Sequence, residues 1–334
     1  MENKKNTWAG KHGPQLIAEI GGNHEGDFEY AKKLTQLAIE SDVDYIKYQI
    51  YTGDTLVNPL ENPVRHKHFK KFELSKEKYI YLADMCKEAG IGFMASIWNP
   101  EFVPWVDKYS EIYKIGSGDF TAIPVIDFFI GLKKPILLST GLCDMAEVRH
   151  IVNYIKNKDS HYQDPNNLAI LQCTSMYPIP FEDANLNVMH TYRKELGIPV
   201  GYSDHTEGSF ALEVAVAMGA EILEFHFTDK REGKTFRDHK VSLTRDEVWE
   251  LSKKIKQIKA LQGSFEKRAL EVEGEHVTTF RRALYFRRDM QKGEKIAPED
   301  IVALRPNHGM DARKYHDILG KTLDQDVKKF ERIN

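Results

Sequence analysis

Eight short apolar runs recur between residues 15 and 227, and nearly every run ends in a residue that can hold a charge or a phosphate. In chain order they are Gln15–Glu19, Val43–Lys47, Gly92–Ser96, Ile112–Lys114, Ile136–Ser139, Ala169–Thr174, Val200–His205 and Ile222–His226. A strand buried on both faces reads as a continuous apolar stretch. In a (β/α)8 TIM barrel the strands are such stretches, and the chemistry takes place at their C-terminal ends. The pattern therefore predicts an α/β fold of this type with an active site at the C-terminal mouth.

Amphipathic stretches separate these runs and are typical of helices. The clearest are residues 28–40, 76–89, 207–218 and 246–261, where apolar side chains recur at helical spacing. Strand-like runs that alternate with helix-like stretches indicate βαβ units and a parallel sheet. The long gap after Gln49 contains two Asn-Pro pairs and a charged, His-rich stretch at residues 65–71, which we expect to be a loop over the barrel mouth, a potential lid.

The periodic pattern changes near residue 262. We expect a catalytic barrel over residues 1–262, a polar linker over 263–280, and a compact β-rich module of short strands and turns over 281–334. So short a module has too little core to be robust alone. We therefore expect it to dock on another surface, most simply a barrel.

Composition excludes several classes of protein. Apolar residues make up 41% of the chain and charged residues 29%, and the net charge of −3 gives no electrostatic reason to expect nucleic acid or an anionic membrane as a partner. No apolar stretch approaches the roughly 20 residues that span a bilayer, and the polar start of the chain shows no signal peptide. Its three cysteines include no CxxC pair, so we expect a reduced, cytoplasmic location.

Three charged residues stand at the ends of the early runs. Glu19 precedes two glycines, which would let backbone approach a carboxylate at the mouth. Lys47 and Lys114 end later runs, and lysines are almost never fully buried without a partner. Two lysines that converge on one mouth indicate either a site for phosphate or carboxylate, or a Schiff base.

Hydroxyl groups recur at the later strand ends. Ser117 lies between two glycines, and Ser139, Ser175 and Ser203 follow or end further apolar runs. Glycines let backbone N–H groups approach a phosphate, and hydroxyls add further hydrogen bonds. Together these residues predict a phosphate cradle built from several strands.

The last two strand ends carry histidines. Glu224 and His226 alternate along one run, so both side chains are expected to face the barrel interior. His205 ends the neighbouring run, and two histidines from adjacent strands could bind one divalent metal with positions left open for water and substrate. Asp238 follows on the next loop and could contact substrate.

The ordered motifs resemble the sialic acid synthases, which are nonulosonic acid synthases that condense phosphoenolpyruvate with an N-acylated hexosamine-type sugar. The resemblance rests on residues 18–26, 47–49, 113–119, 139–141, 173–178, 201–206 and 224–227, and residues 281–333 resemble the C-terminal antifreeze-like, or SAF, domain of that family. It implies a TIM barrel, a divalent metal (manganese foremost, with magnesium or cobalt as alternatives), and a domain-swapped homodimer in which each SAF domain caps the partner's barrel.

The resemblance also implies roles for particular residues. The metal ligands would be His205 and His226, and the catalytic groups would be Glu19, Glu224, Lys47 and Lys114. The groups that hold phosphoenolpyruvate would be Lys47, Ser96, Lys114, Ser117, Ser139, Ser175 and Ser203. The groups that face the sugar would be Glu19, Gln49, Asp119, Tyr177, Asp238 and, from the partner subunit, Arg305. The segment 94–99 departs from the usual family motif, and Ser96 is the only hydroxyl that it keeps.

Two alternatives stay open at this stage. One is a class I aldolase, in which a strand-end lysine forms a Schiff base with pyruvate and no metal is needed. The other is an inactive sugar-binding or ice-binding protein that keeps the SAF module. Within the synthase reading, N-acetylmannosamine and a 2,4-diacetamido-6-deoxy sugar are both candidate acceptors, and a phosphorylated sugar is a third.

Overall fold

The structure is a computed structural model that describes residues 6–334. Its contacts divide the chain into two compact units, one that ends at Gly263 and one that runs from Ser264 to Asn334. None of the helices in the described residues combines the length and the apolarity that a membrane crossing needs.

The first unit is a closed barrel of parallel strands. Strands β2 to β9 pair in sequence order, and β9 closes the ring by pairing with β2. Their bounds are Gly13–Glu19 (β2), Tyr45–Ile50 (β3), Gly92–Ile97 (β4), Ser110–Ile115 (β5), Ile136–Ser139 (β6), Leu168–Cys173 (β7), Val200–Asp204 (β8) and Ile222–His226 (β9), and the short strand β1, Ala9–Gly10, pairs antiparallel with β2. The predicted TIM barrel is thus confirmed, with each apolar run on its own strand.

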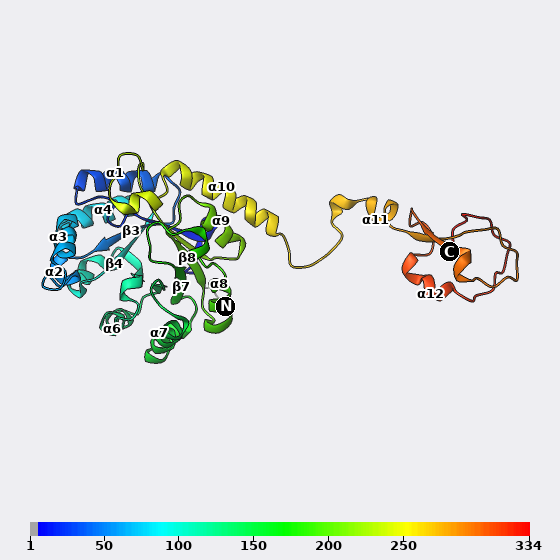
Figure 1. Cartoon of the computed structure of the whole chain (residues 1–334), viewed down its shortest axis with the longest axis horizontal. Coiled ribbons are helices and arrows are strands. Elements are labelled where there is room, and N and C mark those ends of the chain that lie inside the picture. Colours follow the sequence, from blue (N-terminus) through cyan, green and yellow to red (C-terminus); the bar gives the residue numbers. More distant parts are fainter. Residues whose placement is uncertain (1–5) are drawn as a thin grey trace. The chain divides into compact units, whose positions relative to one another are not determined.

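Helices surround the barrel (Figure 1). Their bounds are Phe28–Ile39 (α1), Gly53–Leu56 (α2), Pro63–Phe72 (α3), Lys76–Glu88 (α4), Val103–Val106 (α5), Ile123–Gly131 (α6), Met145–Lys158 (α7), Val188–Leu196 (α8), Phe210–Ala217 (α9) and Arg245–Gln262 (α10). The predicted helices are α1, α4, α9 and α10, whose ends lie within three residues of the expected ones. Side-chain caps define several starts: Asp27 accepts a hydrogen bond from Tyr30 N before α1, and Thr244 and Glu247 form a capping box at α10.

Two apolar layers flank the strands. The larger one includes outward-facing strand residues such as Phe225 together with buried residues of the helices, such as Leu34 and Leu251. The smaller one includes Ile17, Met94, Leu137 and Leu171, and it is the packed interior of the barrel. Because strand side chains alternate in direction, the neighbours of these outward residues point inward and reach the C-terminal mouth.

The segment that precedes α4 differs from the prediction. The stretch Arg65–Lys71, expected to be a loop, lies within helix α3. Asn62 caps this helix by accepting a hydrogen bond from Arg65 N, and Pro63 occupies its first turn, where a missing N–H costs nothing. The helix is strongly charged with little apolar periodicity, so the pattern that revealed the other helices was absent here.

The second unit is small and contains few regular elements. Strands β10 (Ala283–Phe286) and β11 (Ile301–Leu304) pair antiparallel, and short helices lie at His276–Thr279 (α11) and Tyr315–Ile318 (α12). Isolated bridges, such as Met290 with Val327, extend the β structure. The buried core consists of Leu284, Phe286, Met290, Ile296, Ile301, Ile318, Leu323, Val327 and Ile333. The expected compact β-rich module is observed.

Candidate active site

A cavity of about 1330 Å³ opens at the C-terminal ends of the barrel strands. Its walls include α3 and the segment that follows β9. Every barrel residue that the sequence singles out as a site residue lines this cavity: Glu19, Lys47, Gln49, Ser96, Lys114, Ser117, Asp119, Ser139, Ser175, Tyr177, Ser203, His205, Glu224, His226 and Asp238. The fold therefore brings all of them together, whereas their individual roles stay predictions.

Two buried lysines and two buried glutamates form the floor of the cavity. Lys47 Nζ lies 2.6 Å from Glu19 Oε2 and 3.6 Å from Glu224 Oε2, and Lys114 Nζ lies 3.5 Å from Glu224 Oε1. The parallel register of β2, β3 and β9 explains this closeness, since Glu19 stands opposite both Lys47 and His226. The charges compensate one another, as buried charges must.

The pKa values of these four groups follow from burial and from their partners. Burial by itself would raise the pKa of Glu224, but Lys114 and Lys47 outweigh it and hold that pKa below its ordinary value. Burial by itself would lower the pKa of Lys47, but Glu19 and Glu224 outweigh it. Burial lowers the pKa of Lys114 and raises that of Glu19. Glu224 is thus the group best held as a carboxylate, and Lys47 the group best held as a cation.

Hydroxyl groups form an arc beside the lysines. Lys114 Nζ donates to Ser139 Oγ at 2.6 Å, and Ser203 Oγ donates to Glu224 Oε1 at 2.9 Å. A Cβ added at Gly141 would lie 2.2 Å from Ser175 Oγ and 2.8 Å from Ser117 Oγ, so only glycine lets these two hydroxyls approach the turn. The arrangement offers cations, hydroxyl donors and backbone to one anion.

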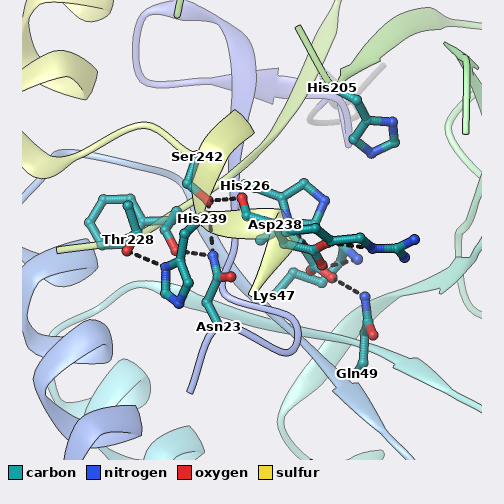
Figure 2. A network of polar contacts seen from close by, with 12 residues as sticks. Asn23, Lys47, Gln49, His205, His226, Thr228, Asp238, His239 and Ser242 are labelled. Atoms are coloured by element: carbon teal, nitrogen blue, oxygen red, sulfur yellow. Dashed lines mark hydrogen bonds and ion pairs between the residues drawn. The ribbon is translucent and has the colours of Figure 1, made fainter. Parts of the chain in front are cut away.

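The rings of His205 and His226 stand 5.3 Å apart between their centroids (Figure 2). His205 Nδ1 lies 2.7 Å from the carbonyl of Thr174, which leaves Nε2 as the ring nitrogen free to bind a ligand. Burial, and then the neighbouring His205, lower the pKa of His226 well below its ordinary value, so its imidazole is neutral. Within the described residues, His226 Nδ1 is buried without a hydrogen-bond partner.

These observations test the expected metal site. Two buried imidazoles, one of them with a nitrogen that lacks a hydrogen-bond partner, match the ligands that divalent transition metals prefer. Within residues 6–334, no group of three or more His, Cys, Asp or Glu side chains has the arrangement of a metal site. The residues therefore fit an open site with two protein ligands, in which water or substrate would supply the rest.

Further polar and aromatic residues form the wall of the cavity beside the histidines and Glu19. The Tyr177 ring lies 4.0 Å from the His205 ring, and the Arg237 guanidinium lies 4.5 Å from the Tyr177 ring centroid. Gln49 Nε2 donates to Glu19 Oε1 at 2.8 Å, and the Trp98 indole donates to Asp119.

Several residues at this wall were not singled out from the sequence. Arg237 pairs with the carboxylate of Asp238 at 3.1 Å, and Trp98 lines the cavity beside Asp119. His68, Phe72 and Phe236 form an aromatic cluster that joins α3 to the segment after β9. Isolated arginine and aromatic side chains carry no periodic signal. The sequence offered two indications: segment 94–99, which departs from the family motif and contains Trp98, and the His-rich stretch 65–71 expected over the mouth, which contains His68.

Arg305 belongs to the second unit. Its side chain is exposed, and its guanidinium lies 5.6 Å from the Phe280 ring centroid. It lies outside the set of residues that line the barrel cavity. Its predicted role requires a partner subunit.

Comparison with known proteins agrees with this geometry. The NeuB family model matches residues 34–267, and the SAF domain model matches residues 281–329. The chain belongs to the NeuB family. This confirms the resemblance on which the sequence analysis relied.

Relatives of this NeuB-family chain carry the names of acidic-sugar synthases. The chain is 34% identical to N,N'-diacetyllegionaminic acid synthase of Legionella pneumophila, with 93% of this chain and 91% of the relative covered. It is 30% identical to pseudaminic acid synthase of Campylobacter jejuni, with 94% and 93% covered. The solved N-acetylneuraminic acid synthetase of Leptospira borgpetersenii, in complex with citrate, matches with a TM-score of 0.72 and 28% identity over 78% of this chain and 89% of that one. These names indicate that the chain is an enzyme of the nonulosonic acid synthase type.

Proposed function

We propose that this protein condenses phosphoenolpyruvate with the open-chain form of an N-acylated hexosamine-type sugar, which yields a nonulosonic acid and inorganic phosphate. One observation carries the proposal: two buried lysines and a group of serine hydroxyls share a cavity with two buried imidazoles. The first set suits a small, multiply charged phosphate ester, and the second suits a divalent metal.

Phosphoenolpyruvate binds at the floor of the cavity. Lys47 and Lys114 neutralise its negative charge, and the hydroxyls of Ser117, Ser139, Ser175 and Ser203 donate hydrogen bonds to its oxygens, with Ser96 as a further candidate. Because Lys114 already contacts both Ser139 and Glu224, the site is arranged before the substrate arrives, which lowers the cost of ordering it.

His205 and His226 hold the divalent metal, for which manganese is the foremost candidate and magnesium or cobalt are alternatives. When bound, such an ion acts as a Lewis acid that polarises a carbonyl oxygen. The two imidazoles keep their ligand nitrogens free because His205 Nδ1 is engaged with the Thr174 carbonyl and His226 is neutral.

In the reaction, the double-bond electrons of phosphoenolpyruvate form a bond from its C3 to the aldehyde carbon of the sugar. The aldehyde C=O π electrons move to the oxygen, which takes up a proton, and the water that adds later releases one in turn. Positive charge develops at C2, where the carboxylates of Glu224 and Glu19 stabilise it. Water then adds at C2, and the tetrahedral intermediate loses inorganic phosphate by cleavage of the C–O bond. Lys47 and Lys114 compensate the charge of the departing phosphate.

The acceptor sugar lies against the polar and aromatic wall of the cavity, where Gln49, Asp119, Tyr177 and Asp238 offer hydrogen-bonding groups. A domain-swapped homodimer completes the site, and Arg305 of the partner subunit reaches the N-acyl group of the sugar. The legionaminic and pseudaminic acid synthases among the relatives favour a 2,4-diacetamido-6-deoxy sugar as the acceptor, and the N-acetylneuraminic acid synthetase favours N-acetylmannosamine.

Release of phosphate from phosphoenolpyruvate tests the proposal. With manganese present, we expect phosphate release that depends on one sugar of a panel containing N-acetylmannosamine, its 6-phosphate and 2,4-diacetamido-6-deoxyhexoses, and mass spectrometry should detect the matching nonulosonic acid. Reactions without sugar control for simple hydrolysis. Binding of a sugar with no phosphate release under any condition would instead support an inactive sugar-binding protein.

A further inference from the structure

Two loops at the barrel mouth are joined by buried side-chain hydrogen bonds that we call the Asn23–Ser242 clamp. Asn23 follows β2, and its Nδ2 donates to the Phe227 carbonyl and to Ser242 Oγ, at 2.9 Å each. Ser242 Oγ in turn donates to the carbonyl of Asp238 at 2.7 Å. Asn23 and Ser242 are both fully buried. Figure 2 shows this chain of contacts running from Asn23 through Ser242 to Asp238.

A second link joins the same two loops. Thr228 Oγ1 lies 2.7 Å from His239 Nδ1, and His239 Nε2 lies 3.3 Å from Glu25 Oε1. Thr228 and His239 are buried like the residues of the clamp. The loop after β2 therefore contacts the segment after β9 through two side chains that follow Asp238, those of His239 and Ser242.

Burial along the segment after β9 changes abruptly where the clamp acts. Residues 229–237 are half-buried or exposed, whereas Asp238, His239, Val241 and Ser242 are buried. The segment is irregular except for a short 3-10 helix at Arg237–Val241, and a mostly irregular segment with an exposed half gains its order from the few contacts that hold it. The clamp provides such contacts at the point where the segment turns back toward the barrel.

The carbonyl that Ser242 holds belongs to the residue whose carboxylate faces the cavity. Asp238 Oδ2 lies 3.9 Å from His226 Nδ1, and Asp238 Oδ1 lies 3.1 Å from Arg237 Nε. Few bonds separate the held carbonyl from the carboxylate, so a shift of this backbone would be passed directly to the carboxylate. Displacement by about 1 Å is enough to reduce the rate of an enzyme by roughly 100-fold.

We propose that Asn23 and Ser242 are positioning residues that hold the Asp238 carboxylate in place for the acceptor sugar, although neither one touches it. The inference rests on the proposed function for the part that Asp238 plays toward the sugar. It explains why Asn23 Nδ2 and the Ser242 hydroxyl bond to each other and to backbone carbonyls and do not point into the cavity.

Ser242→Ala tests the clamp because it removes the hydroxyl that bridges Asn23 and Asp238. We expect the KM for the acceptor to rise about tenfold or more while the KM for phosphoenolpyruvate stays within about twofold. In an Asp238→Ala background, Ser242→Ala should cause no further rise in the acceptor KM, since the two residues act as one unit. Ser242→Cys, which keeps the shape but donates weakly, should change the KM values in the same direction.

Ser41→Ala is the matched control. Ser41 is as deeply buried as Ser242 and donates its hydroxyl to the Ala38 carbonyl at 2.7 Å, but it lies between α1 and β3, at the barrel end opposite the cavity. It should lower the thermal unfolding temperature by a similar amount and leave both KM values unchanged. The control therefore shows whether a loss of stability alone can raise the KM for the acceptor.

Crystal structures of the wild-type protein and Ser242→Ala add a readout that does not depend on turnover. We expect the Asp238 carboxylate to move away from His226 in the variant. An unmoved carboxylate, equal changes in both KM values, or additive effects with Asp238→Ala would overturn the positioning role. If the wild-type protein releases no phosphate with any acceptor, the proposed function is wrong. The positioning role of the clamp is then tested by the crystal structures alone, through the position of the Asp238 carboxylate in the wild type and in Ser242→Ala.

Discussion

Lys47 lies between two carboxylates at the floor of the cavity, with its ammonium 2.6 Å from Glu19 and 3.6 Å from Glu224. All three side chains are less than 10% exposed. A buried ion pair contributes little net stability when it is intact, but removal of one partner leaves an uncompensated buried charge. Lys47 is therefore a residue on which the fold depends, and in the proposed reaction it also neutralises the phosphate.

Lys47→Met should therefore destabilise the protein by about 3–5 kcal/mol and abolish phosphate release. Chemical denaturation and phosphate assays measure the two effects. Lys253→Met is the control, because Lys253 forms an ion pair of 2.6 Å with Glu250 in which the side chains are 66% and 61% exposed, and exposed pairs are worth about 0–1 kcal/mol. Equal stability of the Lys47 and Lys253 variants would contradict the buried-charge argument.

His226→Ala should weaken manganese binding, since it removes one of only two proposed protein ligands. Titration calorimetry with manganese alone measures this without any need for turnover. His190→Ala, which removes an exposed histidine on α8, should leave the titration unchanged. Manganese affinity that is the same in His226→Ala and in the wild type would refute the metal assignment.

Chelation separates the proposed reaction from that of a class I aldolase. Lys114 is the candidate Schiff-base lysine, because burial lowers its pKa and such lysines are activated in this way. We expect dialysis against EDTA to abolish phosphate release, manganese to restore it, and borohydride to trap no pyruvate adduct on the protein. Activity that survives the chelator, together with a borohydride-trapped lysine, would favour the aldolase.

Mixed dimers test whether Arg305 acts in the site of the partner subunit. Arg305→Ala should reduce use of the sugar, with the KM for phosphoenolpyruvate little changed, and His226→Ala should be inactive. A mixture of the two variants, denatured and refolded together, should recover about a quarter of the wild-type activity, because half of the dimers would then hold one complete site. No recovery above the sum of the separate variants would mean that Arg305 does not act across a dimer.

Asp300 makes the stability of the second unit depend on pH. Burial by itself would raise its pKa, but hydrogen bonds from Ala297 N at 2.9 Å and Arg288 Nε at 2.7 Å outweigh it and lower that pKa. A carboxyl group with a lowered pKa in the folded state contributes stability above its unfolded pKa of about 3.9, and this stability is lost as the pH falls through the folded value.

Hydrogen exchange of β10 and β11 in the full chain measures this contribution. Asp300→Asn should exchange faster than the wild type at pH 7, and the difference should shrink as the pH falls below about 4. A difference that stays constant from pH 7 to pH 2 would exclude the carboxylate as its source.

The barrel could be predicted from the sequence because its strands are buried on both faces. Such strands must be apolar along their length, so the polar residue at each C-terminal end stands out, as Lys114 and Ser139 do. The alternation of side chains also predicted that Glu224 and His226 would both face the cavity while Phe225 packs outward, as the structure shows.

The helix over residues 63–72 was not predicted because its charged face carries no apolar repeat. It forms where Asn62 and Pro63 define a start and where its aromatic side chains reach a distant segment. The ring of Phe236 lies beside that of His68 only because the closed barrel brings these two distant segments together.

The sequence by itself determined the order of the strands, the end of the barrel at which the polar groups gather, and the family. These properties follow from local patterns, because burial and side-chain alternation act on neighbouring residues. Only the tertiary structure decided which groups touch: the pairing of Lys47 with two carboxylates and the bond from Asn23 to Ser242, 219 positions further along the chain. Such contacts depend on strand register and on loops meeting across the mouth, and these are set by the closed barrel as a whole.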